Sequence, residues 1–367
     1  MGFIRRSRNA SLFWLDTNPT VSNPQKPVRL SPLLYHLQPY RSSQQAISSQ
    51  ARPRHSQLVS EYWLVADPKL RPNNRSSKLY LLATTHLIQM EAGGLDSKGR
   101  QFRNAEEMWR EQIGEDSDSH KRVDWYRHGV GYWQEVEASV DGVLGGYGRV
   151  NDADIKCSEA FLRTVFSELL VDGGKCRHLV ALDCGSGIGR VTKNLLIRYF
   201  NEVDLLEPVS HFLEAARESL APEGSTASDG HRATNFYCTP LQDFMPEAGR
   251  YDVIWIQWCI GHLTDDDFIS FFSRAKVGLK SGGFFILKEN IARNGFVLDN
   301  EDRSVTRSDS YFKELFRRCG LHLYRTKDQT GFPEELFAVK MYALLTEVPK
   351  RNSSRAKSRA NRPAIIN

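Results

Sequence analysis

The sequence predicts an α/β protein built on a mostly parallel β-sheet with helices on both faces. Two observations carry this prediction. Short apolar runs typical of strands alternate with amphipathic segments typical of helices. The final two runs are joined by a loop without a helix, so we expect them to form an antiparallel hairpin at the sheet edge. The seven expected strands are 179–185, 202–208, 234–240, 251–258, 284–290, 321–326 and 336–345.

Composition places the chain among globular proteins. Its 367 residues are 40% apolar, 25% charged and 11% aromatic, which suffices for one good-sized core. No window approaches the roughly 18 consecutive apolar residues of a membrane-spanning helix, so no membrane partner is expected. The six cysteines show no CxxC pair or regular spacing. This pattern argues against a zinc site or a disulfide scaffold and favours reduced, intracellular thiols, and no metal is expected.

Charge divides the chain into three parts. Residues 1–89 hold 12 basic and 3 acidic residues, 350–367 hold 6 basic and none acidic, and 90–349 hold 31 basic and 41 acidic. Neither end shows a sustained apolar period, so we expect both to be disordered. The acidic middle favours cationic partners, and no nucleic acid is expected to bind it.

The basic ends allow more than one interpretation of localisation. Residues 1–89 have the composition of an organellar transit peptide, but a translated upstream extension would look the same, and Met90 is a plausible alternative start. Residues 350–367 are either a nuclear-targeting segment or an ordinary solvated end. We expect the protein in the cytoplasm and nucleus, with organellar targeting as the alternative.

The middle part, 90–349, is expected to form one domain with an N-terminal helical extension. Its first section, 104–150, contains a helical pattern that places Trp125 and Trp133 on the same stretch, followed by a Gly-rich loop. The strands and helices of the α/β core fill 151–349.

The strongest local signal is LDCGSGIGR, where a strand ends in Asp183, alternate glycines follow from Gly185, and a helix begins at once. Bare backbone can approach a ligand closely there, and a helix N-terminus favours a negative group. A dinucleotide-binding dehydrogenase would also contain such a turn, but here Arg190 stands where the third glycine of GxGxxG belongs. Glu207 ends the next strand, where a carboxylate can accept hydrogen bonds from ribose hydroxyls or simply be solvated.

These features, with LQD at 241–243 and the terminal hairpin, resemble class I S-adenosylmethionine-dependent methyltransferases, which implies a Rossmann-like fold. Longer motifs, namely YWQEVEASVDGVLGGYG, LDCGSGIGRVTKNLL, LQDF, YDVIWIQWCIGHLTD and KENIARNGFVLDNEDRSVTRS, resemble the protein α-N-terminal methyltransferases over about 125–346. The stretch from Met90, with EEMWREQIG, is similar to the plant members. The resemblance implies S-adenosylmethionine as cofactor and methyl transfer to the free α-amine of proteins that begin, after removal of the initiator Met, with X-Pro-Lys.

The resemblance also assigns roles by position. The implied cofactor-binding residues are Gly185, Arg190, Glu207, Leu241, Gln242 and Gln257. The implied peptide-binding residues are Trp133, Leu144, Trp258, Asn290 and Asp299. The implied catalytic residues are Asp302 and His262. Members often carry Asp in place of Glu207 and Tyr in place of Phe337; the longer carboxylate should still reach ribose, whereas Phe337 cannot donate a hydrogen bond to the peptide.

The residues themselves support these roles and leave alternatives. Trp258 ends a strand, where open α/β sheets bind ligands, and its flat face suits a proline ring; a buried core Trp is a description that fits Trp255 better. His262 could take a proton or cap the next helix. The acidic run 298–304, in a loop after the strand ending in Asn290, is either a solvated loop or a wall that pairs with a substrate Lys.

Three other functions remain possible from the sequence. A methyltransferase of a small metabolite is permitted because fold does not fix substrate, although WCIGH and LDNED argue against it. A non-catalytic reader of basic N-termini is disfavoured by the intact glycines, by Glu207 and by Asp302. A nicotinamide oxidoreductase is disfavoured by the early third glycine and by the terminal hairpin.

Overall fold

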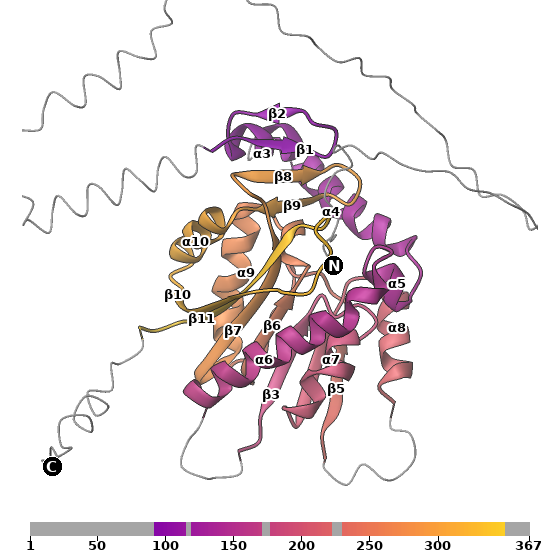
Figure 1. Ribbon diagram of the computed structural model, residues 1–367, viewed down its shortest axis with the longest axis vertical. Helices are drawn as coiled ribbons and strands as arrows, with labels where there is room; N and C mark the ends of the chain where they lie inside the picture. The colour runs from indigo at the N-terminus through magenta and orange to yellow at the C-terminus, as the bar shows by residue number, and fades with distance from the viewer. Residues whose placement is uncertain (1–91, 115–118, 171–176, 222–229, 349–367) are drawn as a thin grey trace, which may run out of the picture. The chain divides into compact units, whose positions relative to one another are not determined.

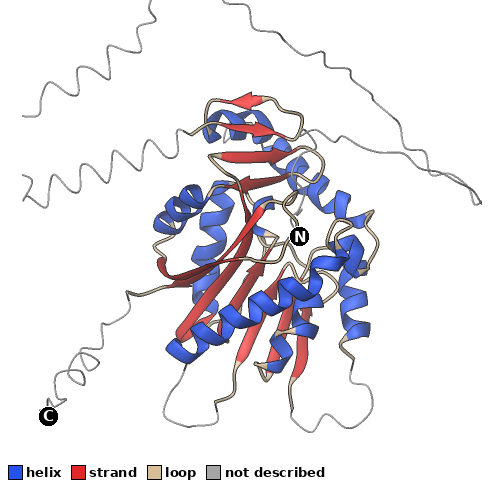
Figure 2. Cartoon of the chain, viewed as in Figure 1, coloured by secondary structure: helices blue, strands red, loops and turns tan. Residues whose placement is uncertain are grey.

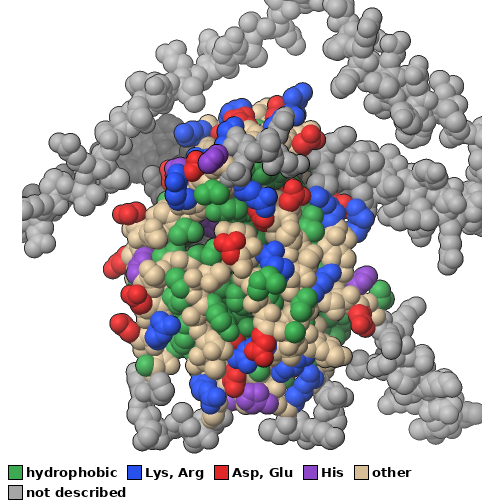
Figure 3. Space-filling model, turned by 180° about the vertical axis from the view of Figure 1, so that it is seen from behind, with side chains coloured by type: hydrophobic (Ala, Val, Ile, Leu, Met, Phe, Trp, Pro, Cys, Tyr) green, Lys and Arg blue, Asp and Glu red, His purple; other side chains and the backbone are tan. Residues whose placement is uncertain are grey.

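The computed structural model describes residues 92–114, 119–170, 177–221 and 230–348. The expectations for 1–89 and 350–367 lie outside these residues. The described chain forms a seven-stranded sheet with helices on both faces, and a second, four-stranded sheet (Figure 1, Figure 2). No helix in these ranges is long and apolar enough to cross a membrane. Basic and acidic side chains are interspersed on the face seen in Figure 3.

The seven-stranded sheet confirms the expected architecture. In spatial order its strands are β10 (His322–Asp328), β11 (Ala338–Leu345), β7 (Leu279–Ile291), β6 (Tyr251–Gln257), β3 (Val180–Cys184), β4 (Glu202–Leu206) and β5 (Arg232–Tyr237). Strands β7, β6, β3, β4 and β5 pair in parallel, whereas β11 pairs antiparallel with both β7 and β10. The terminal hairpin therefore lies at the sheet edge, as its helix-free loop predicts, with its second strand inserted next to β7.

Helices cover the sheet in two layers with separate cores. One face carries α6 (Asn151–Leu169), α7 (Arg190–Asn194) and α8 (Ser210–Ser219), and the other carries α9 (Asp265–Gly278) and α10 (Asp309–Arg318). Phe161 of α6 packs in one core with Trp255, which is fully buried, so Trp255 is the core tryptophan that the sequence indicates. Phe272 of α9 packs edge-on against Phe285 of β7 in the other core.

One expected helix is shorter than its pattern suggests. The helix expected directly after the glycine turn is present, but α7 (Arg190–Asn194) is only five residues long and a 3-10 turn, η2 (Leu196–Arg198), follows it. Leu195 leaves the helical region, with φ −135° and ψ −65°. Both Leu195 and Leu196 are fully buried, so the break lets two consecutive apolar side chains reach the core.

The four-stranded sheet is a feature that the sequence did not predict. Its order is β2 (Gln101–Phe102), β1 (Gly94–Asp96), β8 (Phe296–Asp299) and β9 (Ser304–Arg307). Strands this short carry no period to detect, and β1 pairs in parallel with a partner far away in sequence. The acidic run expected in a plain loop is instead the end of β8 and the turn into β9.

Two helices connect the small sheet to the core and confirm the helical extension. They are α3 (Ala105–Ile113) and α4 (Ser119–Gln134). The rings of Trp109 on α3 and Trp125 on α4 pack edge-to-face with centroids 5.2 Å apart. The Gly-rich loop that follows contains one helical turn, α5 (Val140–Val143), and a 3-10 turn, η1 (Gly148–Val150).

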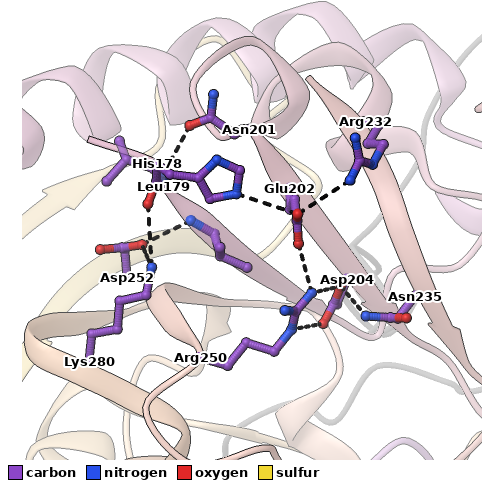
Figure 4. A network of polar contacts seen from close by, with 11 residues as sticks. His178, Leu179, Asn201, Glu202, Asp204, Arg232, Asn235, Arg250, Asp252 and Lys280 are labelled. Atoms are coloured by element: carbon purple, nitrogen blue, oxygen red, sulfur yellow. Dashed lines mark hydrogen bonds and ion pairs between the residues drawn. The ribbon is translucent and has the colours of Figure 1, made fainter. Parts of the chain in front are cut away.

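Buried charges tie the strands together toward their amino ends (Figure 4). The buried Asp252 carboxylate accepts hydrogen bonds from the backbone of Val180 (2.9 Å) and from Lys280 Nζ (2.6 Å). Asp204 accepts from Arg250 Nε (2.7 Å) and Tyr251 Oη (2.9 Å). These carboxylates are occupied by structural partners, which leaves the opposite, carboxyl ends of the strands as the functional edge.

Candidate active site

The glycine turn joins the carboxyl ends of three strands. Gly185 lies directly after β3 with φ +63°, a conformation that favours glycine. Its N–H donates to the carbonyl of Leu206, the last residue of β4 (2.8 Å). A Cβ at this position would lie 2.3 Å from Cys259 Cβ, just beyond β6. Only glycine therefore permits the strands to approach this closely.

Glu207 follows β4 and is fixed by backbone donors. Its Oε2 accepts from the N–H of Gly187 (2.9 Å) and its Oε1 from the N–H of Val209 (3.0 Å). Burial raises the pKa of Glu207 above its ordinary value, although these two N–H groups act in the opposite direction. Each oxygen keeps a further lone pair for a ligand.

A cavity opens beside this carboxylate. Its walls include six of the residues that the sequence assigned to the site: Gly185, Glu207, Leu241, Gln242, Trp133 and His262. The remaining walls are mainly apolar and aromatic, and Arg303 contributes a cation. This mainly apolar lining with a few polar groups is typical of a site for a small organic ligand.

A second, smaller cavity also has Gly185 in its lining. It is lined by Arg190, Gln257 and Trp258 among others. All six predicted cofactor residues thus line one of two cavities that share Gly185.

A buried ionic network, which the sequence analysis missed, holds the smaller cavity in shape. Asp154 of α6 accepts from Arg190 Nη1 (2.7 Å) and from Gln257 Nε2 (3.0 Å), and it also accepts from Lys288 Nζ. Burial alone would raise the pKa of Asp154, but the charges of Lys288 and Arg190 outweigh it and lower the pKa. A lysine inside the apolar run FFILKEN was the available signal, because a buried strand carries a charge only where it is paired.

Trp258 is held in a strained conformation above this network. Its φ is +53°, which a bulky residue rarely adopts. The guanidinium of Arg190 lies 5.8 Å from its ring centroid, Lys288 Nζ lies 5.7 Å away, and the Phe332 ring lies 6.4 Å away. Its indole Nε1 is buried and has no hydrogen-bond partner among the residues that the structure describes. Such a strained, unsatisfied aromatic residue is typical of a ligand site.

His262 lies in η3 (Ile260–His262) between two other site elements. Its Nε2 accepts from the indole N–H of Trp133 (3.2 Å), and its Nδ1 lies 3.1 Å from the carbonyl of Arg303. An indole N–H can only donate, so Nε2 carries the lone pair and Nδ1 donates to the carbonyl. His262 therefore connects Trp133 to the acidic turn.

Asp302 is buried within that turn and its carboxyl group lines neither cavity. Its Oδ1 accepts from Ser304 Oγ (2.6 Å), while Oδ2 has no partner within the described ranges. Burial, with the nearby charge of Asp299, raises the pKa of Asp302 to about 7. Its backbone carbonyl lies next to Gly129, which does line the larger cavity.

Asp299 is half-buried and accepts from the N–H of Glu301 (2.8 Å).

The other expected peptide-binding residues lie around Trp258. Leu144 is buried in one apolar cluster with Trp133 and Trp258. Asn290 is buried near the end of β7, where it pairs with Val339 of the same cluster. Phe337 lies two residues before Val339 and is half-buried.

The two cavities fit S-adenosylmethionine. Glu207 offers lone pairs suited to ribose hydroxyls, and Leu241 gives an apolar wall beside it. Arg190 lines the smaller cavity and shares the Asp154 carboxylate with the buried Lys288 behind it, so its guanidinium is suited to a carboxylate ligand. Ser186 Oγ, also on that wall, is buried without a hydrogen-bond partner in the described residues. A ligand would satisfy it.

Known proteins resemble this chain in sequence. A family model described as AdoMet-dependent proline di-methyltransferase matches residues 121–345. The chain is 68% identical over 279 residues to Alpha N-terminal protein methyltransferase 1 of Arabidopsis thaliana, covering 76% of this chain and 100% of that protein. It is 42% identical over 223 residues to N-terminal Xaa-Pro-Lys N-methyltransferase 1 of Danio rerio, covering 61% and 96%.

A solved structure of a methyltransferase also resembles this chain. A SAM-dependent methyltransferase from Leishmania major is 34% identical, with a TM-score of 0.60, and the match covers 76% of this chain and 100% of that one. The family match spans more than half of the chain. The chain therefore belongs to the AdoMet-dependent proline di-methyltransferase family and is an S-adenosylmethionine-dependent methyltransferase.

Proposed function

We propose that this enzyme methylates the free α-amine of proteins whose mature N-terminus is X-Pro-Lys. The observation that carries the proposal is the unpartnered carboxylate oxygen of Asp302, buried in an acidic turn whose next residue, Arg303, lines the larger cavity. A buried carboxylate without a donor is costly unless a ligand supplies one, and an ammonium group does so. The names of the relatives, which refer to N-terminal and Xaa-Pro-Lys substrates, support the same substrate class.

The chemistry requires the amine to lose a proton. When bound, S-adenosylmethionine supplies an electrophilic methyl group, and only the lone pair of the amine can attack it. An α-amine with an ordinary pKa of about 7.7–8.0 is mostly protonated at neutral pH. Asp302, with a pKa of about 7, is matched to accept that proton. Its carboxyl group lies outside both cavities, so the docked peptide has to reach it past Gly129 and Arg303, which line the larger cavity.

His262 contributes first by position. With Nδ1 bonded to the carbonyl of Arg303 and Nε2 accepting from Trp133, it holds the acidic turn against the aromatic wall. It can take a proton at Nε2 only if Trp133 releases that nitrogen. We therefore assign the proton to Asp302 and the orientation of the turn to His262. Trp258 would pack its face on the substrate proline, and Asp299 would pair with the substrate lysine.

The decisive experiment compares two peptides. The enzyme is incubated with labelled S-adenosylmethionine and either a Ser-Pro-Lys peptide or the same peptide with an acetylated N-terminus. We expect label only in the free peptide. Equal labelling of both would place the methyl group on the lysine side chain and reject the proposal. Peptide binding without labelling would instead support a non-catalytic reader, and neither binding nor labelling would support a small-metabolite substrate.

A further inference from the structure

The segment Gly94–Ile113 (β1, β2 and α3), named the platform below, lies outside the part of the chain that the family model matches. It nevertheless contacts the substrate side of the site, because β1 extends the β8–β9 hairpin that bears Asp299 and Asp302 (Figure 1). The question is therefore what the platform does to that hairpin.

The first contact fixes one side of the hairpin turn. Gly94 and Leu95 pair in parallel with Phe296 and Val297, and the N–H of Ser97 donates to the carbonyl of Leu298 (2.7 Å). The N–H of Asn300, inside the turn, donates to Ser97 Oγ (3.2 Å). The chain before Asp302 is thus hydrogen-bonded to β1.

The second contact fixes the other side of the turn. Arg303 Nη1 donates to Gln112 Oε1 on α3 (3.0 Å), and its guanidinium lies 6.0 Å from the ring centroid of Trp125 on α4. The backbone of Arg303 is strained, with φ +55°. Strain of this kind, of order 1–3 kcal/mol, persists only where surrounding contacts hold it.

The positive charge of Arg303 could compete with a cationic substrate for the carboxylates of the acidic turn. It is a permanent cation on the wall of the larger cavity, next in sequence to Asp302. A guanidinium pairs readily with carboxylates, often through two hydrogen bonds. If it turned to the acidic residues of its own loop, it would neutralise the charge that a cationic peptide needs.

We propose that the platform is a positioning element for the peptide and that Gln112 is its key residue. By accepting a hydrogen bond from Arg303, Gln112 directs the guanidinium to α3 and leaves the carboxylates of Asp299 and Asp302 to the substrate. The platform therefore sets affinity for the cationic N-terminus, and it contributes none of its own residues to the lining of the two cavities. This inference rests on the proposed function.

The test uses two adjacent residues of α3 in the full chain. Gln112→Ala removes the bond to Arg303, whereas Glu111→Ala, the matched control, removes an ion pair with Arg100 that stays within the platform. We expect Gln112→Ala to lower kcat/KM for a Ser-Pro-Lys peptide about tenfold, mainly through KM, with unchanged S-adenosylmethionine affinity and Tm. Glu111→Ala should stay within about twofold of the unaltered protein, because its exposed ion pair contributes little. Gln112→Glu, which keeps an acceptor, should restore KM.

A double substitution separates positioning from general support. If freed Arg303 causes the defect, Gln112→Ala should have no further effect once Arg303→Met has removed the charge. An equal defect in the Arg303→Met background, or equal behaviour of Gln112→Ala and Glu111→Ala, would overturn the inference.

Amide hydrogen exchange gives a readout that does not depend on the substrate. Gln112→Ala should increase exchange at residues 299–303, and Glu111→Ala should not. If the unaltered enzyme leaves the peptide unmethylated, the proposed function fails, and this exchange comparison still decides whether the platform restrains the turn. Identical exchange in the two variants would reject the restraint.

Discussion

Several carboxyl groups around the site are buried without a salt bridge to any residue that the structure describes. Burial raises the pKa values of Asp183, Glu289 and Asp302 to about 7 each. Their folded pKa values lie above those of the unfolded chain, so their contribution to the free energy of unfolding is fully present below about pH 4 and is lost as pH rises through about 7. A bound cation near Asp302 would offset part of that loss. Substrate binding and charge at the acidic turn are therefore linked.

The role of Asp302 is the first prediction at the residue scale. Asp302→Asn keeps the shape of the side chain and the bond from Ser304 but cannot accept the proton. We expect turnover to fall roughly 10²–10⁴-fold at neutral pH with a smaller change in peptide affinity. The rate should recover partly at higher pH, as solvent deprotonates the amine. Rate measurements across pH, with calorimetry of peptide binding, test both expectations.

Asp299→Asn serves as the control for this prediction. Asp299 is half-buried at the end of β8 and is expected to pair with the substrate lysine, so its loss should raise KM more than it lowers turnover. If Asp302→Asn behaves in the same way, or keeps normal turnover at neutral pH, Asp302 anchors the substrate and the base must be His262 or water.

At the scale of elements, the glycine turn predicts that a side chain at Gly185 lowers both stability and cofactor affinity. The sequence suggested that a side chain at Gly185 would obstruct the cofactor; the structure adds that it would collide with Cys259, 2.3 Å from the new Cβ. Gly185→Ala should therefore lower the free energy of unfolding by about 2–4 kcal/mol, from the positive φ and the overlap together, and also weaken S-adenosylmethionine binding. Urea unfolding and calorimetry measure the two effects.

Gly131 is the matched control for this substitution. It lies on α4 with open space where a Cβ would go and without a positive φ. Gly131→Ala should leave cofactor affinity unchanged and stabilise the fold by about 0.5–1 kcal/mol. A Gly185→Ala protein as stable as the unaltered one would show that β6 can move away from the turn.

The elements that periodicity could predict are those that bury several residues on one face. All seven strands of the main sheet were predictable, because each is long enough to show an apolar run. Strands β1 and β2, of three and two residues, were not, since their partners are supplied by tertiary contact and not by local pattern. The break at Leu195 was missed for the same reason: core packing overrides helix propensity there.

For the whole molecule, local sequence signals indicated individual site residues but not the polar contacts between them. Gly185 and Glu207 were predictable because a turn and a strand end leave local signals. The contacts of Asp154, which join α6, α7, β6 and β7, depend on four segments separated in sequence. The same holds for the bond between Arg303 and Gln112. Such long-range polar contacts leave no periodic trace in a single chain.

The last prediction concerns which part of the chain performs the chemistry. Both cavities, the acidic turn and the platform lie within 92–348, and residues 1–89 and 350–367 show no apolar face in sequence that could join the core. A chain shortened to 90–349 should therefore methylate a Ser-Pro-Lys peptide with turnover close to that of the full chain. Steady-state kinetics on both proteins measure this. A loss beyond about tenfold, equivalent to about 1.4 kcal/mol in the barrier, would mean that a terminal segment takes part in catalysis. If only KM for the peptide rose, a segment would instead help to recruit the substrate.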